Sequence, residues 1–235
     1  ALRTPLTLIE GPLSEVLADE KLPEADREYL TVVQTNAHRM LNLINQILDF
    51  RKIQNEKMRL LVEKLNVRES LEAIMENFEN IARQHRIDFR LEMGADDVYV
   101  WADRDKFEKI FVNIISNAFK YTPPGKTITV RVKSDDENVV VAVQDQGVGI
   151  QPSKVAMLFQ RFDTILQDNI YQQSTGIGLS LVKQLVDLHH ARIDVQSEEG
   201  VGSTFEVSFP VGKTHLEDDE RVEFLMNDDI GRRGQ

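Results

Sequence analysis

The chain has 235 residues, of which 41% are hydrophobic and 29% charged, a balance typical of soluble globular domains. Its net charge of -11 argues against a general binder of nucleic acid, which needs a basic face. The absence of cysteine excludes disulfides, thiol catalysis and cysteine-based metal sites, and the five histidines lack metal-ligand spacing. No apolar run approaches the roughly 18–20 residues of a membrane span.

Residues 1–60 are predicted to form a helical hairpin, broken at Leu22-Pro23-Glu24. Apolar residues recur at steps of three and four on both sides of this break: Leu2, Leu6, Ile9, Leu13 and Val16, then Leu30, Val33, Ala37, Met40, Ile44 and Ile47. A second stripe, Leu41 and Leu48, flanks the first. Because one hairpin cannot bury two stripes alone, we expect a symmetric dimer that forms a four-helix bundle. Packing of the hairpin on the rest of its own chain is the alternative.

The pattern changes near Leu61 to alternating strands and helices. Strands are expected near residues 58–62, 87–93, 98–102, 127–134, 138–144, 192–197 and 203–210. Helices are expected at 67–85, 106–119 and 178–188. The fold class is therefore α+β, with a helical hairpin followed by an α/β two-layer sandwich. Residues 213–235 are interpreted as a solvated linker or tail.

Asn113 and Asn117 lie four residues apart and therefore share one face of a predicted helix. Amide oxygens are good neutral ligands for Mg²⁺, which brings substrate phosphates with it. Lys120 lies on a neighbouring part of that face and can neutralise phosphate charge. Taken alone, the two asparagines are better explained as part of a solvated face.

Asp145 opens a glycine-containing turn, Asp145-Gln-Gly147-Val-Gly149, directly after an apolar strand. The glycines let the backbone approach a planar ligand, and a carboxylate there can accept from the exocyclic amine of an adenine. An ordinary turn after a strand explains this segment equally well.

Two further glycine segments follow. Gly176 and Gly178 open a strong helix pattern, where exposed amides and the helix dipole favour phosphate. The polar segment 163–175 before it suits a mobile lid, with Phe159 and Phe162 as apolar anchors or as ordinary core residues. The last segment, Gly200-Val-Gly-Ser-Thr204-Phe, by itself indicates only a hairpin.

In this order and spacing, these segments resemble the N, G1, F, G2 and G3 boxes of the histidine kinase catalytic domain, which shares its ATP-binding fold with gyrase, Hsp90 and MutL. Leu2-Arg-Thr4-Pro-Leu6 resembles the end of the family's H-box. The resemblance covers roughly residues 1–211. It implies a dimerisation and phosphotransfer hairpin at 1–60 and a catalytic ATP-binding domain at 61–212.

The resemblance also implies roles for individual residues. Asn113 and Asn117 match the Mg²⁺ ligands, Lys120 and Tyr121 match residues near the phosphates and nucleoside, and Asp145 matches the adenine-reading acid. Thr4 matches a position that assists phosphatase chemistry. The remaining nucleotide-binding positions are Gly147, Gly149, Gly176, Gly178, Leu179 and Thr204.

By the same resemblance, the phosphoacceptor histidine would immediately precede Ala1, and Ala1 stands where the family has a glutamate. We therefore expect a chain that binds ATP and does not phosphorylate itself. His38, beside the apolar stripe, is interpreted as a packed or surface residue.

The resemblance implies phosphoryl transfer from ATP to a histidine and onward to a receiver aspartate, in the cytoplasmic portion of an inner-membrane sensor. The segment 7–13 and the tail near 210–216 further resemble Bacteroides-type hybrid systems, in which the receiver lies in the same polypeptide. No direct nucleic acid contact is expected of residues 1–235. A hydrolytic ATPase of the gyrase or Hsp90 kind is disfavoured, because those relatives carry a general-base glutamate where this chain has Asn113. A dimeric scaffold that binds nucleotide without transferring it is the other alternative.

Overall fold

A computed structural model describes residues 3–19, 21–55, 57–94, 96–159 and 177–225. Two helices form an N-terminal hairpin, α1 (Arg3–Leu17) and the longer α2 (Glu24–Gln54). Acidic residues lie in the first turn of α2 and basic residues in its last turn, so the charges at both ends interact favourably with the helix dipole and stabilise the helix. No helix among the described residues has the length and apolar content to cross a membrane.

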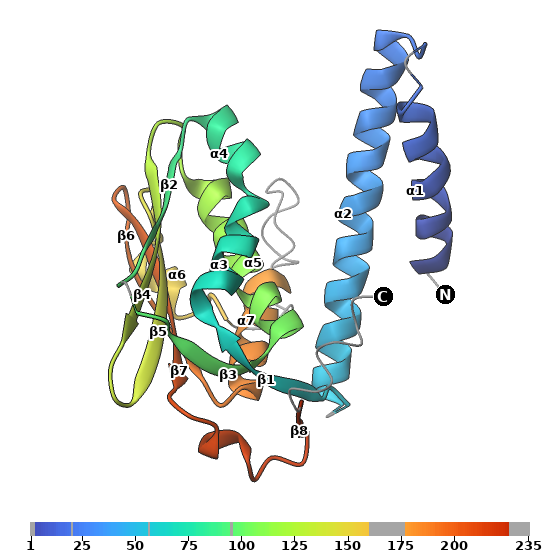
Figure 1. The fold of residues 1–235 in the computed structure, drawn as a ribbon. Helices are drawn as coiled ribbons and strands as arrows, with labels where there is room; N and C mark the ends of the chain where they lie inside the picture. Colours follow the sequence, from blue (N-terminus) through green and yellow to red (C-terminus); the bar gives the residue numbers. More distant parts are fainter. Residues whose placement is uncertain (1–2, 20, 56, 95, 160–176, 226–235) are drawn as a thin grey trace.

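The remainder is an α/β sandwich beside this hairpin (Figure 1). Its five-stranded sheet has the order β2-β4-β5-β7-β6, with only the β2–β4 pair parallel. The strands are β2 (Asp88–Glu92), β4 (Thr127–Ser134), β5 (Asn138–Asp145), β6 (Arg192–Glu198) and β7 (Gly202–Pro210). The covering helices are α3 (Val67–Glu76), α4 (Glu79–His85), α5 (Arg104–Tyr121) and α7 (Ile177–Leu188). A short α6 (Pro152–Val155) follows β5.

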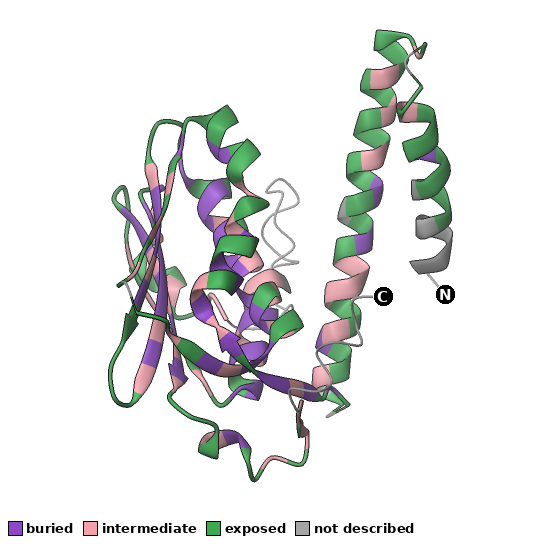
Figure 2. Cartoon of the chain, viewed as in Figure 1, coloured by how far each residue is buried: buried purple, intermediate pink, exposed green. Residues whose placement is uncertain are grey.

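The core lies between the sheet and this helical layer (Figure 2). On β4, Ile128, Val130 and Val132 are buried at alternate positions, as strict alternation predicts. They face α5, whose Phe107, Phe111 and Ile115 are buried in turn. Two layers of apolar side chains thus fix α5 and its polar edge relative to the sheet.

The predicted helix at 67–85 is two helices, because the chain turns at Asn77 and Phe78 between α3 and α4. Phe78 stacks on Phe119 of α5, with ring centroids 5.4 Å apart, and meets Phe89 of β2 edge-on. This aromatic contact draws the chain onto the core at the break.

A second, three-stranded sheet has the order β3-β1-β8 and lies at the base of α2 (Figure 1). It comprises β1 (Leu60–Asn66), β3 (Tyr99–Asp103) and β8 (Val222–Phe224), which pairs in parallel with β1. The linker interpretation of 213–235 is therefore wrong for the described part of that segment. Leu216, in the short 3₁₀ helix η1 (Thr214–Leu216), is fully buried, and Phe224 meets Trp101 edge-on.

Candidate functional site

A cleft of about 790 Å³ opens between α2, α5, the start of α7 and the turn after β5. This volume lies within the roughly 300–1,000 Å³ of sites that hold small ligands. Eight of the residues singled out from the sequence line it: Asn113, Asn117, Lys120, Tyr121, Asp145, Gly149, Gly178 and Leu179.

Helix α5 supplies the polar edge of the cleft. Asp103 caps the start of α5, since its side chain accepts from the backbone N–H of Lys106. One turn separates Asn113 from Asn117, so both amides reach the cleft. The Nδ2 of Asn113 donates to the carbonyl of Lys109 at 2.7 Å, which turns Oδ1 away from its own helix. The amide oxygen is thereby positioned as an acceptor.

Asp145 ends β5 and is only 7% exposed. Its Oδ1 accepts the backbone N–H of Gly147 at 2.8 Å. Burial raises the pKa of Asp145, and the N–H groups of Gly147 and Ser203 offset part of that rise. A buried carboxylate with one oxygen held by its own turn is suited to accept a hydrogen bond from a ligand at the other.

Two glycines allow the close backbone approaches that shape the cleft. Gly149 has φ +67°, and a Cβ there would lie 1.9 Å from the carbonyl oxygen of Glu198. A Cβ on Gly178 would lie 2.8 Å from Oδ1 of Asn113. The first position needs glycine for its backbone angle and the second for space.

Other predicted positions lie elsewhere. Thr204 does not line the cleft: it pairs with Gln144, on the face of the sheet opposite to Asp145 and Ser203. The nucleotide-binding expectation for Thr204 is therefore not supported, and its neighbours Ser203 and Phe205 line the cleft instead. Gly147 is buried behind Asp145, where a Cβ would lie 2.6 Å from the Asp145 carboxylate, so it shapes the turn.

Some expectations fall outside what the structure describes. Gly176, the expected lid at 163–175 and Phe162 are outside the described residues. Thr4 lies in α1, and its side chain is not described. Phe159 is half-buried and packs against the core, which agrees with the simpler of its two interpretations.

Sequence reasoning missed the α2 side of the cleft. Five residues of α2 line it: Thr35, His38, Asn42, Leu43 and Gln46. Four of these are polar and recur at steps of three and four, a second face beside the apolar stripe. That polar face was readable in the sequence, but only the tertiary structure shows that it borders the cleft. His38 is exposed and lines this border, in agreement with its interpretation as a surface residue.

The fold and cleft define an ATP-binding α/β sandwich joined to a helical hairpin, and comparison with known families gives the same class. Residues 102–213 match the model for histidine kinase-, DNA gyrase B- and HSP90-like ATPases. Residues 1–56 match the His Kinase A (phospho-acceptor) domain.

The chain belongs to the sensor histidine kinase family. It is 37% identical to histidine kinase P4 of Formosa agariphila over 98% of this chain, and 34% identical to sensor histidine kinase TmoS of Ectopseudomonas mendocina over 89%. It spans only 17% and 22% of those two relatives. The crystal structure of full-length ShkA in complex with AMPPNP has the same fold, with a TM-score of 0.74 and 24% identity over 89% of this chain and 43% of ShkA.

Proposed function

We propose that the cleft binds ATP with its adenine at Asp145 and its phosphates toward Asn117 and Lys120. The observation that carries the proposal is the convergence, in one cleft, of amides from α5, the buried carboxylate ending β5 and the close-packed glycines at Gly149 and Gly178. The buried carboxylate of Asp145 is suited to accept a hydrogen bond from the exocyclic amine of adenine. Val148 lines the cleft beside it and offers an apolar surface to the base.

The same residues fit Mg²⁺ carried in with the nucleotide. Asn113 and Asn117 contribute neutral amide oxygens, and Mg²⁺ prefers oxygen ligands and shares its coordination with phosphates. The hydrogen bond from Asn113 to Lys109 leaves its oxygen directed away from α5. When bound, the metal would neutralise charge on the phosphates.

We infer that the reaction is transfer of the γ-phosphoryl group to a histidine, and onward to an aspartate of a response-regulator receiver. The imidazole nitrogen forms a bond to phosphorus as the bond to the bridging oxygen breaks, and ADP leaves. Residues of this chain act by positioning and by charge neutralisation, Lys120 toward the phosphates and Asp145 at the base. Leu2–Leu6 supports an acceptor position just ahead of Ala1, so residues 1–235 alone are expected to bind ATP without phosphorylating themselves. Thr4 is proposed to assist dephosphorylation of the receiver.

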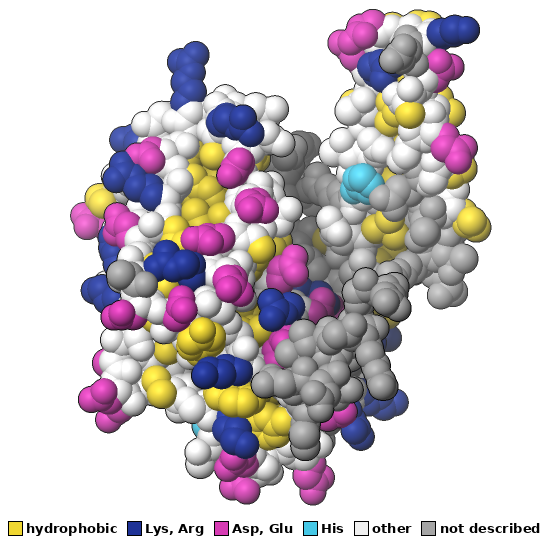
Figure 3. Space-filling view, in the orientation of Figure 1, with side chains coloured by type: hydrophobic (Ala, Val, Ile, Leu, Met, Phe, Trp, Pro, Cys, Tyr) yellow, Lys and Arg dark blue, Asp and Glu magenta, His cyan; other side chains and the backbone are white. Residues whose placement is uncertain are grey.

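The hairpin at 1–60 is proposed to supply a homodimer, with the catalytic domain at 61–212. Several large apolar side chains of α1 and α2 are exposed, among them Ile9, Val33, Met40 and Leu48. Figure 3 shows apolar side chains on the surface of the hairpin. Residues spaced in this way pair well in a four-helix bundle. Membership of the sensor histidine kinase family supports, in general terms, both a dimer of this chain and a response-regulator receiver as its partner. The same proposal places this chain on the cytoplasmic side of an inner membrane. It also places a receiver in the same polypeptide.

A gyrase-like ATPase is the competing function, and Asn113 argues against it. A general base must take a proton from the attacking water, and an amide cannot do so at neutral pH. Slow release of phosphate is therefore expected.

The experiment incubates labelled ATP and Mg²⁺ with residues 1–235 and with a version carrying His-Glu ahead of Leu2. Acid-labile, base-stable label on the second protein alone supports the proposal. Robust label on the first would mean that the acceptor is placed wrongly. Rapid phosphate release without label would favour the ATPase.

A further inference from the structure

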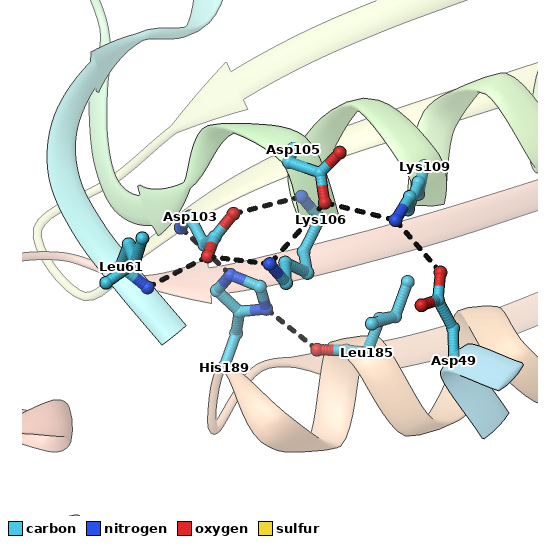
Figure 4. Close-up of polar contacts among 8 residues, drawn as sticks. All are labelled: Asp49, Leu61, Asp103, Asp105, Lys106, Lys109, Leu185 and His189. Atoms are coloured by element: carbon cyan, nitrogen blue, oxygen red, sulfur yellow. Dashed lines mark hydrogen bonds and ion pairs between the residues drawn. The ribbon is translucent and has the colours of Figure 1, made fainter. Parts of the chain in front are cut away.

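The polar face of α2 contacts α5 at two points. Gln46 Nε2 donates to Asn113 Oδ1 at 3.3 Å, and the Lys109 ammonium lies 2.9 Å from the Asp49 carboxylate. Gln46 and Asp49 are about one turn apart on α2, as Lys109 and Asn113 are on α5. Side chains of the two helices therefore meet at two points about one turn apart, and Figure 4 shows the contact between Lys109 and Asp49.

Gln46 donates to Asn113 Oδ1, the same oxygen that is proposed to bind Mg²⁺. The amide nitrogen of Asn113 is held by the Lys109 carbonyl, so Oδ1 is the only end of this side chain available to a cation. Gly178 packs close to the same oxygen. A cation bound there would face the N–H group of Gln46, whose hydrogens carry partial positive charge.

The Lys109 contact can be released at low cost. Its ammonium lies between Asp49, at 2.9 Å, and Asp105 of its own helix, at 3.1 Å. When α2 moves away, Asp105 still pairs with the ammonium, so no unpaired charge is left on α5.

We propose that α2 is a reversible latch on the nucleotide site: it docks through Gln46 and Asp49, and its docking competes with Mg²⁺-nucleotide for Asn113. This inference rests on the proposed nucleotide site and adds a regulation of it. Coupling of this kind is reciprocal, so Mg²⁺-nucleotide also weakens the docking of α2. A signal that moves α2 would then change nucleotide affinity directly.

The test measures binding of AMPPNP by calorimetry, with Mg²⁺ and with the metal chelated, in the 235-residue chain and in Gln46→Leu. Leucine keeps the bulk of the side chain and removes the donor. We expect Mg²⁺-AMPPNP to bind about three- to tenfold more tightly in the variant, the range that one lost hydrogen bond permits. Without Mg²⁺ the two affinities should agree within about twofold. Gln34→Leu is the matched control, since Gln34 lies on the same helix but contacts Ser14 of α1; its affinity should not change.

A second variant and a hydrogen-exchange measurement complete the test. Asp49→Asn weakens the other contact without touching Asn113, and should tighten Mg²⁺-AMPPNP binding in the same direction. Hydrogen exchange of residues 43–53 should become faster when Mg²⁺-AMPPNP binds. Weaker binding of Mg²⁺-AMPPNP in Gln46→Leu would mean that Gln46 helps to hold the metal, and it would overturn the latch. An affinity for Mg²⁺-AMPPNP that is the same in the variant and the unaltered chain would overturn it too. If the unaltered chain fails to bind AMPPNP, the nucleotide site itself is rejected, a result distinct from both.

Discussion

The Nε2 of His189, at the end of α7, accepts a hydrogen bond of 3.1 Å from the backbone N–H of Asp103, which precedes α5 (Figure 4). Its Nδ1 donates to the carbonyl of Leu185 at 2.7 Å, so the ring is held as one neutral tautomer. His189 is fully buried. The contact fixes the two helices that carry the nucleotide cleft relative to each other.

This geometry predicts a pH-dependent stability. Burial lowers the pKa of His189 to about 4. Lys106 and His215 lower this pKa further, whereas the Leu185 carbonyl and Asp103 raise it. The unfolded chain binds a proton near pH 6.5, so the contribution of His189 is complete above that pH and is lost as the pH falls toward 4. Urea unfolding at several pH values should show a loss of up to about 3 kcal/mol from this group. In His189→Leu, about 1–3 kcal/mol less stable at pH 7, the difference from the unaltered chain should shrink as the pH falls. Parallel curves would contradict this role.

Asp145→Asn should weaken nucleotide binding without unfolding the domain. The amide oxygen of asparagine can still accept the N–H of Gly147, which preserves the turn. Its nitrogen, however, is a donor, and would oppose the exocyclic amine of adenine. We expect AMPPNP affinity measured by calorimetry to fall about tenfold or more. The control is Asp194→Asn, an exposed change on β6. Equal affinities in the two variants would reject the adenine-reading role.

Charged substitutions on the exposed face of α2 should separate the dimer. Val33 and Met40 are 48% and 52% exposed, and they lie two turns apart on one face. The double change Val33→Glu with Met40→Glu places charges where the four-helix bundle would exclude water. Light scattering should then give the mass of one chain. Val201→Glu, an exposed apolar position on the turn before β7, should leave the dimer intact. A dimer that survives the double change would place the interface elsewhere.

The segment leading to β8 should stabilise the catalytic domain through Asp219. Its carboxylate accepts from Arg221 at 2.9 and 2.7 Å, and lies 2.8 Å from Nε2 of His190. These contacts hold the chain where β8 pairs with β1. Asp219→Ala should lower the free energy of unfolding in urea by about 1 kcal/mol, because Arg221 and His190 lose the partly buried acceptor that they share. Asp218→Ala, an exposed neighbour, should change it little. Equal effects of the two changes would indicate that the segment adds no stability through this carboxylate.

The sequence predicted the elements whose periodicity is local. The strand at 127–134 has the expected bounds, and α5 and α7 extend only slightly beyond their expected ranges. Alternation and the helical repeat are set by the backbone itself, so they can be read without knowing the partner element. The break between α3 and α4 was missed because the stacking of Phe78 on Phe119, far along the chain, helps to decide it.

For the site, the sequence by itself identified Asn113, Asn117, Lys120 and Asp145, because their order and spacing are typical of one family, and the structure places them in one cleft. Only the tertiary structure turned Thr204 to the other face of the sheet, a matter of strand register. Only the tertiary structure set β8 against β1, since three residues with no strong pattern become a strand when an edge is available. It also brought Gln46 to Asn113, 67 residues apart, because the position of α2 beside the catalytic domain depends on its packing against α7, and no local pattern encodes that contact.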